Sequence, residues 1–139
     1  MRISLIVLFT VLCISACSDR DDTIPDFLHG SWDVQNISGG FAGIDQDFEA
    51  ETVIWNFDSD TNILTVVNNH ELVDVVYDGL DSGTYEYSIL QVEDQNFLII
   101  DEVEFAGFDF LTNQILLDQN KLSTGTGADG FLLLFNRVP

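Results

Sequence analysis

The stretch TVIWNFDSDTNILTVV, residues 52–67, decides the fold class of this chain of 139 residues. Val53, Trp55 and Phe57 fall on one face of an extended segment, because side chains along a β-strand alternate with a period of two. The turn-forming run DSDTN, residues 58–62, separates this segment from a second apolar run at 63–67. The stretch therefore predicts a β-hairpin.

Similar short runs, broken by turn residues, fill the rest of the chain after Pro25. Strands are expected at residues 32–37, 52–57, 63–67, 72–77, 84–90, 97–103, 110–117 and 131–137, with a long connection at 39–51 and turns at 79–83 and 125–130. No helical pattern competes with them. About eight strands at this spacing predict an all-β domain, either an antiparallel up-and-down barrel or a sandwich.

The two ends of this strand series favour the barrel. Gly30, Ser31 and Trp32 open the first strand, and Arg137 stands near the end of the last. A barrel pairs its first and last strands, so a guanidinium can cover an indole face there, an interaction that contributes about 0.5–2 kcal/mol. The alternative is that Trp32 is simply a core residue and Arg137 a solubilising one.

This pattern resembles the lipocalin-like family, in which a Gly-x-Trp at the start of the first strand lies under an arginine of the closing strand. The stretches 32–40, 53–57 and 83–88 are also similar to landmarks of small lipocalin-like lipoproteins of Bacteroidota. The resemblance implies that Gly30, Trp32 and Arg137 close the barrel. The domain is shorter than a typical lipocalin and lacks a disulfide. A smaller barrel with a small or filled interior is therefore the alternative.

The first residues indicate export. Arg2 precedes an apolar run, 3–12, that is too short to span a bilayer but suits a secretory signal. Cys17 follows Ile14, Ser15 and Ala16, which resembles the lipobox of bacterial lipoproteins. The resemblance implies that residues 1–16 are removed and that Cys17 carries a lipid that anchors the chain in the membrane. A disulfide between Cys13 and Cys17, the alternative, would close a strained loop.

The acidic run at 18–22 resembles the export signal that sends Bacteroidota lipoproteins to the cell surface, which implies an outer-membrane protein exposed on that surface. The alternative is a solvated tether, because a run without apolar residues does not order itself. Thr23 lies in a short stretch that resembles the O-glycosylation motif of that group. We expect a signal peptide at 1–16, a lipidated flexible acidic tether at 17–26 and the lipocalin-like barrel at 27–139.

The charge of the chain excludes one class of partner. Without Arg2, three basic residues face 24 acidic ones, a formal charge of −21. Such a surface offers no patch that neutralises phosphates, so nucleic acid is not an expected partner. The charge favours solubility in a salty environment, and a protein partner with a basic surface is the second possibility.

The sequence gives little support for catalysis. His29 and His70 are the only histidines, and neither is placed like a buried general base. A Gly-x-Ser-x-Gly nucleophile motif is absent, and a pair such as Glu102 and Glu104 arises easily by chance among so many acids. We therefore expect no enzyme and no cofactor.

A metal site is also not expected. Asp58, Asp60 and Asn62 alternate like the first ligands of a calcium loop, which makes them weak candidates, but the glycine and the distant glutamate of such a loop are missing. Four more acidic residues alternate in the expected connection after the first strand. They indicate either a solvated loop or a weak cation site. The four are Asp45, Asp47, Glu49 and Glu51.

The main hypothesis is a lipid-anchored barrel that binds a small apolar or amphipathic molecule through a mouth beside residues 39–51. Trp55, Phe57, Tyr85 and Tyr87 are the expected cavity-lining residues, because aromatic rings supply contact area and tyrosine hydroxyls can orient a ligand. A packed core is the alternative for these four. The rival function is a non-catalytic structural or interaction module of an outer-membrane assembly, with a filled interior.

Overall fold

The computed structural model describes residues 26–71 and 76–139, which form an all-β domain preceded by one short 3-10 helix. The elements are η1 (Asp26–Leu28), β1 (Gly30–Gly39), β2 (Ile44–Asp47), β3 (Val53–Asp58), β4 (Ile63–Asn68), β5 (Gly83–Val92), β6 (Gln95–Ile100), β7 (Val103–Leu111), β8 (Gln114–Asp118), β9 (Lys121–Leu122), β10 (Gly125–Thr126) and β11 (Phe131–Arg137). This part of the chain has no helix of the length and hydropathy that a bilayer span requires.

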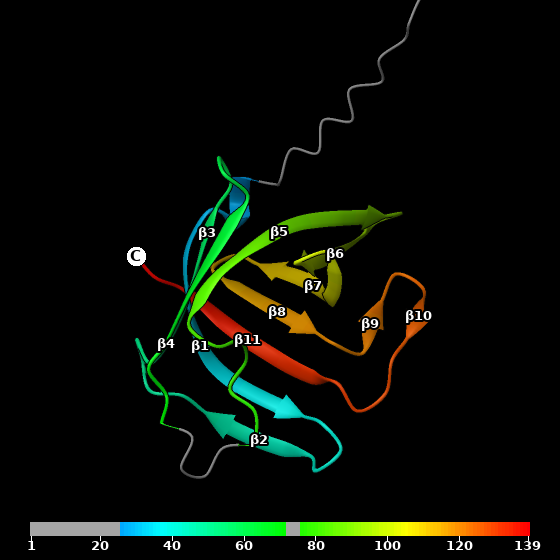
Figure 1. Ribbon diagram of the computed structural model, residues 1–139. Helices are drawn as coiled ribbons and strands as arrows, with labels where there is room; N and C mark the ends of the chain where they lie inside the picture. The colour runs from blue at the N-terminus through cyan, green and yellow to red at the C-terminus, as the bar shows by residue number, and fades with distance from the viewer. Residues whose placement is uncertain (1–25, 72–75) are drawn as a thin grey trace, which may run out of the picture.

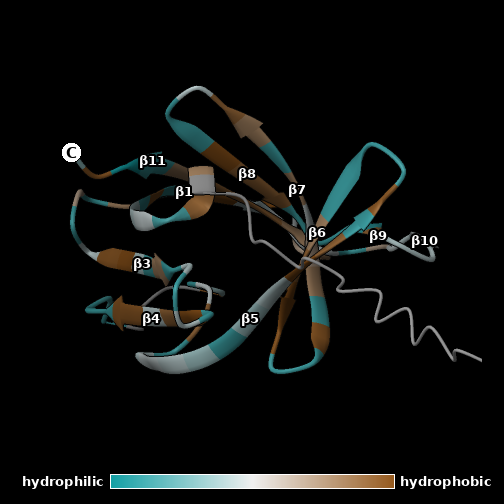
Figure 2. Ribbon diagram, turned by 90° about the horizontal axis from the view of Figure 1, so that it is seen from above, coloured by the Kyte–Doolittle hydropathy of each residue, from teal (hydrophilic) through white to brown (hydrophobic). Residues whose placement is uncertain are grey.

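Eight of the strands close into an antiparallel barrel, which confirms the predicted fold class. Neighbours follow the order β1-β3-β4-β5-β6-β7-β8-β11, and β11 pairs back onto β1 from Trp32↔Arg137 to Gly39↔Phe131. Figure 2 looks along this ring of strands. Because each strand neighbours the next barrel strand along the chain, the topology is up-and-down.

The prediction of a long connection at residues 39–51 was wrong in part, because β2 lies within this range. The first half of β1 pairs with β3, and its second half pairs with β2. Gly39 makes the tight turn possible: its φ is +98°, and a Cβ there would lie 2.9 Å from the carbonyl oxygen of Gly130. Residues 36–47 therefore form a hairpin, which lies at the lower end of the barrel in Figure 1.

The strand boundaries expected in the second half were also wrong. The strand predicted at 97–103 ends earlier, since the chain turns at Asp101 and Glu102 and continues as β7. Both turn residues have positive φ, 47° and 67°, a conformation usually signalled by asparagine or glycine. A second turn, between β7 and β8, divides the stretch predicted as one strand at 110–117. The pair Asp101 and Glu102 contains neither glycine nor asparagine, so the sequence pattern did not predict this reversal.

The strand expected at 72–77 falls mainly on 72–75, outside the described residues, and Val76 and Tyr77 are not in a strand. The described end of this connection packs on the barrel. The ring of Tyr77 stacks on that of Phe131 with 4.2 Å between centroids, and Leu80 packs against the core. A Cβ on Gly79 would lie 3.7 Å from the Trp55 ring. Residues 77–80 therefore lie over the aromatic interior.

The connection from β8 to β11 carries a small hairpin, β9 and β10, that covers the outer face of β7. The approach is close at Gly107, where a Cβ would lie 2.6 Å from the Cβ of Lys121. Glu104 on β7 accepts hydrogen bonds from the backbone N–H and the hydroxyl of Ser123. Figure 1 shows the hairpin in orange beside the barrel wall.

Candidate functional site

One end of the barrel is closed by the side chain of Arg137. Its guanidinium carbon lies 4.8 Å from the centroid of the Trp32 ring, and the two residues are partners in the β1–β11 ladder. The guanidinium also donates from Nη2 to the carbonyl oxygens of Phe27, at 3.0 Å, and His29, at 2.6 Å. Gly30 is suited to its position by its backbone, since its φ is +114°, whereas a Cβ there would meet Nη2 only at 3.8 Å, an ordinary contact.

Aromatic rings also cover this end of the barrel. Trp32 is fully buried, and its Nε1 donates to the carbonyl oxygen of Leu28 at 2.8 Å. Phe110 contacts Trp32 edge-on at 6.0 Å between centroids and Phe27 at 4.6 Å. These contacts fix η1 across the barrel end.

Three of the four expected cavity residues come together as one row inside the barrel. Trp55 and Phe57 alternate along β3, and Phe57 meets Tyr87 of β5 edge-on at 5.0 Å between centroids. All three are buried, with exposed fractions of 0%, 2% and 3%. Phe135 lies 5.0 Å from Trp55 between ring centroids, so the row is enclosed by neighbouring rings.

Tyr85, the fourth expected cavity residue, lies outside this row. Its hydroxyl donates to the carbonyl oxygen of Asp81 at 2.8 Å in an exposed hydrogen bond. The ring is only partly buried and packs against the edge of the core. Its hydroxyl already has a partner at the surface, so it is not free to orient a ligand inside the barrel.

The row carries two buried polar groups without partners. Among the described residues, neither Trp55 Nε1 nor the Tyr87 hydroxyl makes a hydrogen bond, although both atoms are buried. A buried polar group left unpaired costs about 1–3 kcal/mol. Burial, and then the charge of Asp58, raises the pKa of Tyr87 to about 12, so its hydroxyl keeps its proton at neutral pH. Two donors are therefore available in an apolar interior.

Asp58, one of the weak metal candidates, forms hydrogen bonds within the turn between β3 and β4. One oxygen of Asp58 accepts hydrogen bonds from the backbone N–H groups of Asp60, at 3.0 Å, and Thr61, at 3.4 Å. Hydrogen bonds from Thr61 and Asp60 lower the pKa of Asp58. Within the described ranges, no three His, Cys, Asp or Glu side chains are grouped so that they could hold a metal ion.

The other alternating acids lie on or next to β2. Asn36 donates from one amide nitrogen to both Asp45 and Asp47, each at 2.9 Å, on the outer face. This amide bridges two carboxylates of one strand. Asn36 had no sequence signal, because its role depends on the β1–β2 register.

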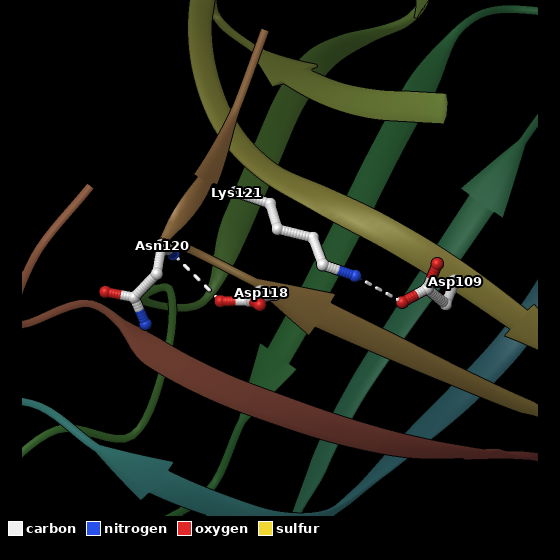
Figure 3. Close-up of polar contacts among 4 residues, drawn as sticks. All are labelled: Asp109, Asp118, Asn120 and Lys121. Atoms are coloured by element: carbon white, nitrogen blue, oxygen red, sulfur yellow. Dashed lines mark hydrogen bonds and ion pairs between the residues drawn. The ribbon is translucent and has the colours of Figure 1, made fainter. Parts of the chain in front are cut away.

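Lys121 and Arg137 are the lysine and the arginine among the described residues, and the side chains of both have hydrogen-bond partners. Lys121 Nζ donates to Asp109 Oδ2 at 2.7 Å, and this hydrogen bond raises the pKa of the lysine (Figure 3). In the same view Asp118 accepts from the backbone N–H of Asn120 at 2.9 Å, which shapes the turn before the lysine. Lys121 is therefore an ion-pair residue.

Sequence reasoning missed residues that enclose the row. Phe135 and Leu133 are buried core residues on β11, and Phe105 lies 5.7 Å from Trp55 between ring centroids. The period of two through residues 131–137 would have found the first two. Phe105 had no such signal, because the β6–β7 ladder shifts register opposite Leu98 and Ile99.

Comparison of the sequence with known protein families and characterised proteins, and of the fold with solved structures, finds no match. The geometry alone then defines the class: a closed eight-stranded antiparallel barrel with an aromatic interior, sealed at one end by Arg137. This fold is compatible with a ligand-binding module of the lipocalin-like type.

Proposed function

We propose that this chain is a lipid-anchored lipocalin-like protein that binds a small, neutral, amphipathic molecule inside the barrel. The observation that carries the proposal is the pair of unpartnered donors, Trp55 Nε1–H and the Tyr87 hydroxyl, buried in one aromatic row. A ligand oxygen that accepts from either donor removes the free-energy cost of leaving it unpaired. The proposed role is binding, without catalysis or a cofactor.

The charge of the chain restricts the ligand class. Asp58 lies close enough to Tyr87 to raise its pKa, and the chain as a whole is strongly acidic. A buried anion in this field would be both desolvated and repelled. The proposed ligand therefore carries a neutral acceptor, such as a ketone or ester carbonyl, on an apolar body.

Access to the row would occur beside residues 77–80. Gly79 lies against Trp55 and Leu133, and Leu80 packs on the core. The ligand would displace these contacts, because Gly79 and Leu80 cover this part of the row. This route lies opposite the end that Arg137 seals.

The test uses three probes of equal chain length: a long-chain methyl ketone, the corresponding alkane and the corresponding fatty acid. Isothermal titration of the complete chain in detergent should show the ketone binding most tightly. Tyr87→Phe should weaken the ketone about tenfold, the loss of one hydrogen bond of about 1.4 kcal/mol, and leave the alkane unchanged. Equal binding of all three probes, or of none, would contradict the proposal.

We also propose that Cys17 anchors the chain in the outer membrane, with residues 17–26 as tether and the barrel on the cell surface. The support comes from the sequence: the short apolar run at 3–12, the small residues before Cys17 and the acids that follow it. Lipid chains contribute about 0.8 kcal/mol per buried methylene, so two or more give stable attachment.

A second candidate is an interaction module with a permanently filled barrel. Phe41, at the tip of the β1–β2 hairpin, is 93% exposed, and an aromatic side chain in that position suits protein contact. Native mass spectrometry separates the two candidates. A retained small molecule supports ligand binding, whereas a barrel without a bound small molecule that captures a basic protein supports the interaction module.

A further inference from the structure

The strand β5 changes partner halfway along its length. Its first half, from Gly83 to Glu86, pairs with β4, whereas its second half, from Tyr87 to Val92, pairs with β6. Among residues 26–71 and 76–139, no strand pairs with the other edge of the second half. Figure 1 shows this half of β5 extending past the turn between β3 and β4. The closed barrel therefore has an open strand edge in its wall.

The backbone groups that face this edge follow from one hydrogen bond. The N–H of Tyr87 donates to the carbonyl oxygen of Asn62 at 3.0 Å, on the side opposite β6. In an antiparallel strand alternate residues direct their N–H and C=O to the same side. Ile89 and Gln91 therefore present their N–H and C=O groups to the open edge, whereas Ser88 and Leu90 direct theirs to β6.

The open edge lacks the usual protection against strand addition. Exposed edges commonly carry a lysine, a proline or a bulge that prevents pairing with another chain. Residues 88–92, Ser-Ile-Leu-Gln-Val, contain no charge, proline or glycine, and the β5–β6 register runs through them without a shift. Leu90 and Val92 are 40% and 38% exposed, so the edge also offers apolar side chains.

Acidic residues stand at both ends of this edge. At one end Glu86 and Glu102 line a pocket of about 350 Å³ that also includes Asn62. At the other end Glu93 and Asp94 form the exposed turn into β6. Lys121 lines a second pocket together with Val92 and Glu93, but its Nζ is paired with Asp109. Arg137, the other described residue of the Lys and Arg type, is engaged over Trp32.

We propose that the edge of β5 formed by residues 88–92 binds an extended, basic segment of a partner protein, which adds to the sheet as an antiparallel or parallel strand. Backbone hydrogen bonds to Ile89 and Gln91 provide the pairing, and basic side chains near both ends of the segment meet the acidic groups. A second copy of this chain is a poor occupant, because the formal charge is −20. This surface lies on the wall of the barrel and does not depend on the interior ligand.

The test uses a nine-residue peptide of alternating valine and threonine with lysine at both ends, and the same peptide with glutamate at both ends. With the complete chain in detergent, we expect the lysine peptide to bind at least about tenfold more tightly, since like charges at an interface are strongly disfavoured. Equal affinities, or no binding of the lysine peptide, would overturn the proposal.

Hydrogen exchange locates the contact. The amides of Ile89 and Gln91 should exchange rapidly in the free protein and slow by about tenfold or more with the lysine peptide, while those of Ser88 and Leu90 are already protected. Slow exchange of Ile89 and Gln91 without peptide would show that the edge is already covered, which contradicts the proposal.

Variants separate backbone pairing from side-chain contact. Gln91→Pro removes an outward N–H and should abolish peptide binding, whereas Gln91→Ala keeps the N–H and should bind as the native chain does. If Gln91→Pro fails to fold, a lysine peptide N-methylated at its central residues replaces it and should not bind to the native chain. Binding of that peptide at native strength would overturn strand addition. Tyr87→Phe should leave lysine-peptide binding unchanged, which keeps this test distinct from that of the interior ligand.

Discussion

The guanidinium of Arg137 lies over the indole of Trp32, 4.8 Å from its ring centroid, and donates at the same time to the carbonyl oxygens of Phe27 and His29. This side chain thus connects the last barrel strand, the first barrel strand and the segment before it. Phe27 and Arg137 are 110 positions apart in the sequence. The contact therefore adds to the β1–β11 ladder that closes the barrel.

Arg137→Ala should lower the free energy of unfolding by about 1–3 kcal/mol, because it removes the cation–π contact and leaves carbonyl groups unpaired. Arg137→Lys should recover only part of this loss, since an ammonium lacks the planar face and the fork of donors. Urea melts followed by tryptophan fluorescence measure both changes.

Lys121→Ala is the charge-matched control for Arg137→Ala. It breaks an exposed ion pair with Asp109, which contributes about 0–1 kcal/mol. Identical urea midpoints for the two alanine variants would show that the contact of Arg137 with Trp32 adds nothing to stability.

Gly107→Ala should destabilise the protein by about 1–3 kcal/mol, because the new Cβ would overlap the Cβ of Lys121 and push the β9–β10 hairpin off β7. Gly83→Ala is the control, since its Cβ would meet only Tyr85 at 3.6 Å, an ordinary contact. Thermal melts of both variants check the difference, and equal stability would exclude close packing at Gly107.

Alkaline pH should destabilise the fold through Tyr87. The folded protein holds the pKa of Tyr87 at about 12, above its ordinary value of 10.0. The unfolded chain therefore releases this proton first, so stability is fully present below pH 10 and falls as the pH rises toward 12. Tyr87→Phe should flatten the decline in the urea midpoint over this range.

Part of the alkaline decline will remain in Tyr87→Phe, because burial also raises the pKa of Tyr77. An unchanged slope in the variant would mean that Tyr87 is not held protonated by the barrel interior. Tyrosinate absorbance during the same titration gives a second reading of the ionisation.

Cys17→Ser should move the protein from the membrane fraction to a soluble or unprocessed pool, because lipidation requires the thiol. Cys13→Ser should leave the protein in the membrane. Fractionation followed by immunoblotting compares the two, and equal behaviour of both variants would eliminate Cys17 as the anchor.

Replacement of Asp19, Asp21 and Asp22 by alanine should keep the protein in the outer membrane but hide it from protease added to intact cells. The reason is that the acidic run is proposed to act as the surface-export signal. If protease access does not change, the run is a tether only.

Local pattern was sufficient for much of the fold. The alternation of Val53, Trp55 and Phe57 identified β3 and its inward face, because burying every second side chain leaves a period of two in the sequence. The same reasoning failed at Asp101 and Glu102, where two acids adopt positive φ without a glycine or an asparagine. The Asp101 side chain accepts a hydrogen bond from the backbone N–H of Glu86, a contact that exists only after β5 has come alongside.

What the sequence determined by itself is the strand alternation and, through it, the aromatic character of the interior. Two features were decided only by tertiary structure. The missing partners of Trp55 Nε1 and the Tyr87 hydroxyl depend on which strands face each other across the barrel. The open edge of β5 arises because closing eight tilted strands staggers their ladders, so β4 and β6 meet different halves of β5. Local sequence encodes the face of each strand, whereas the stagger is a property of the closed ring.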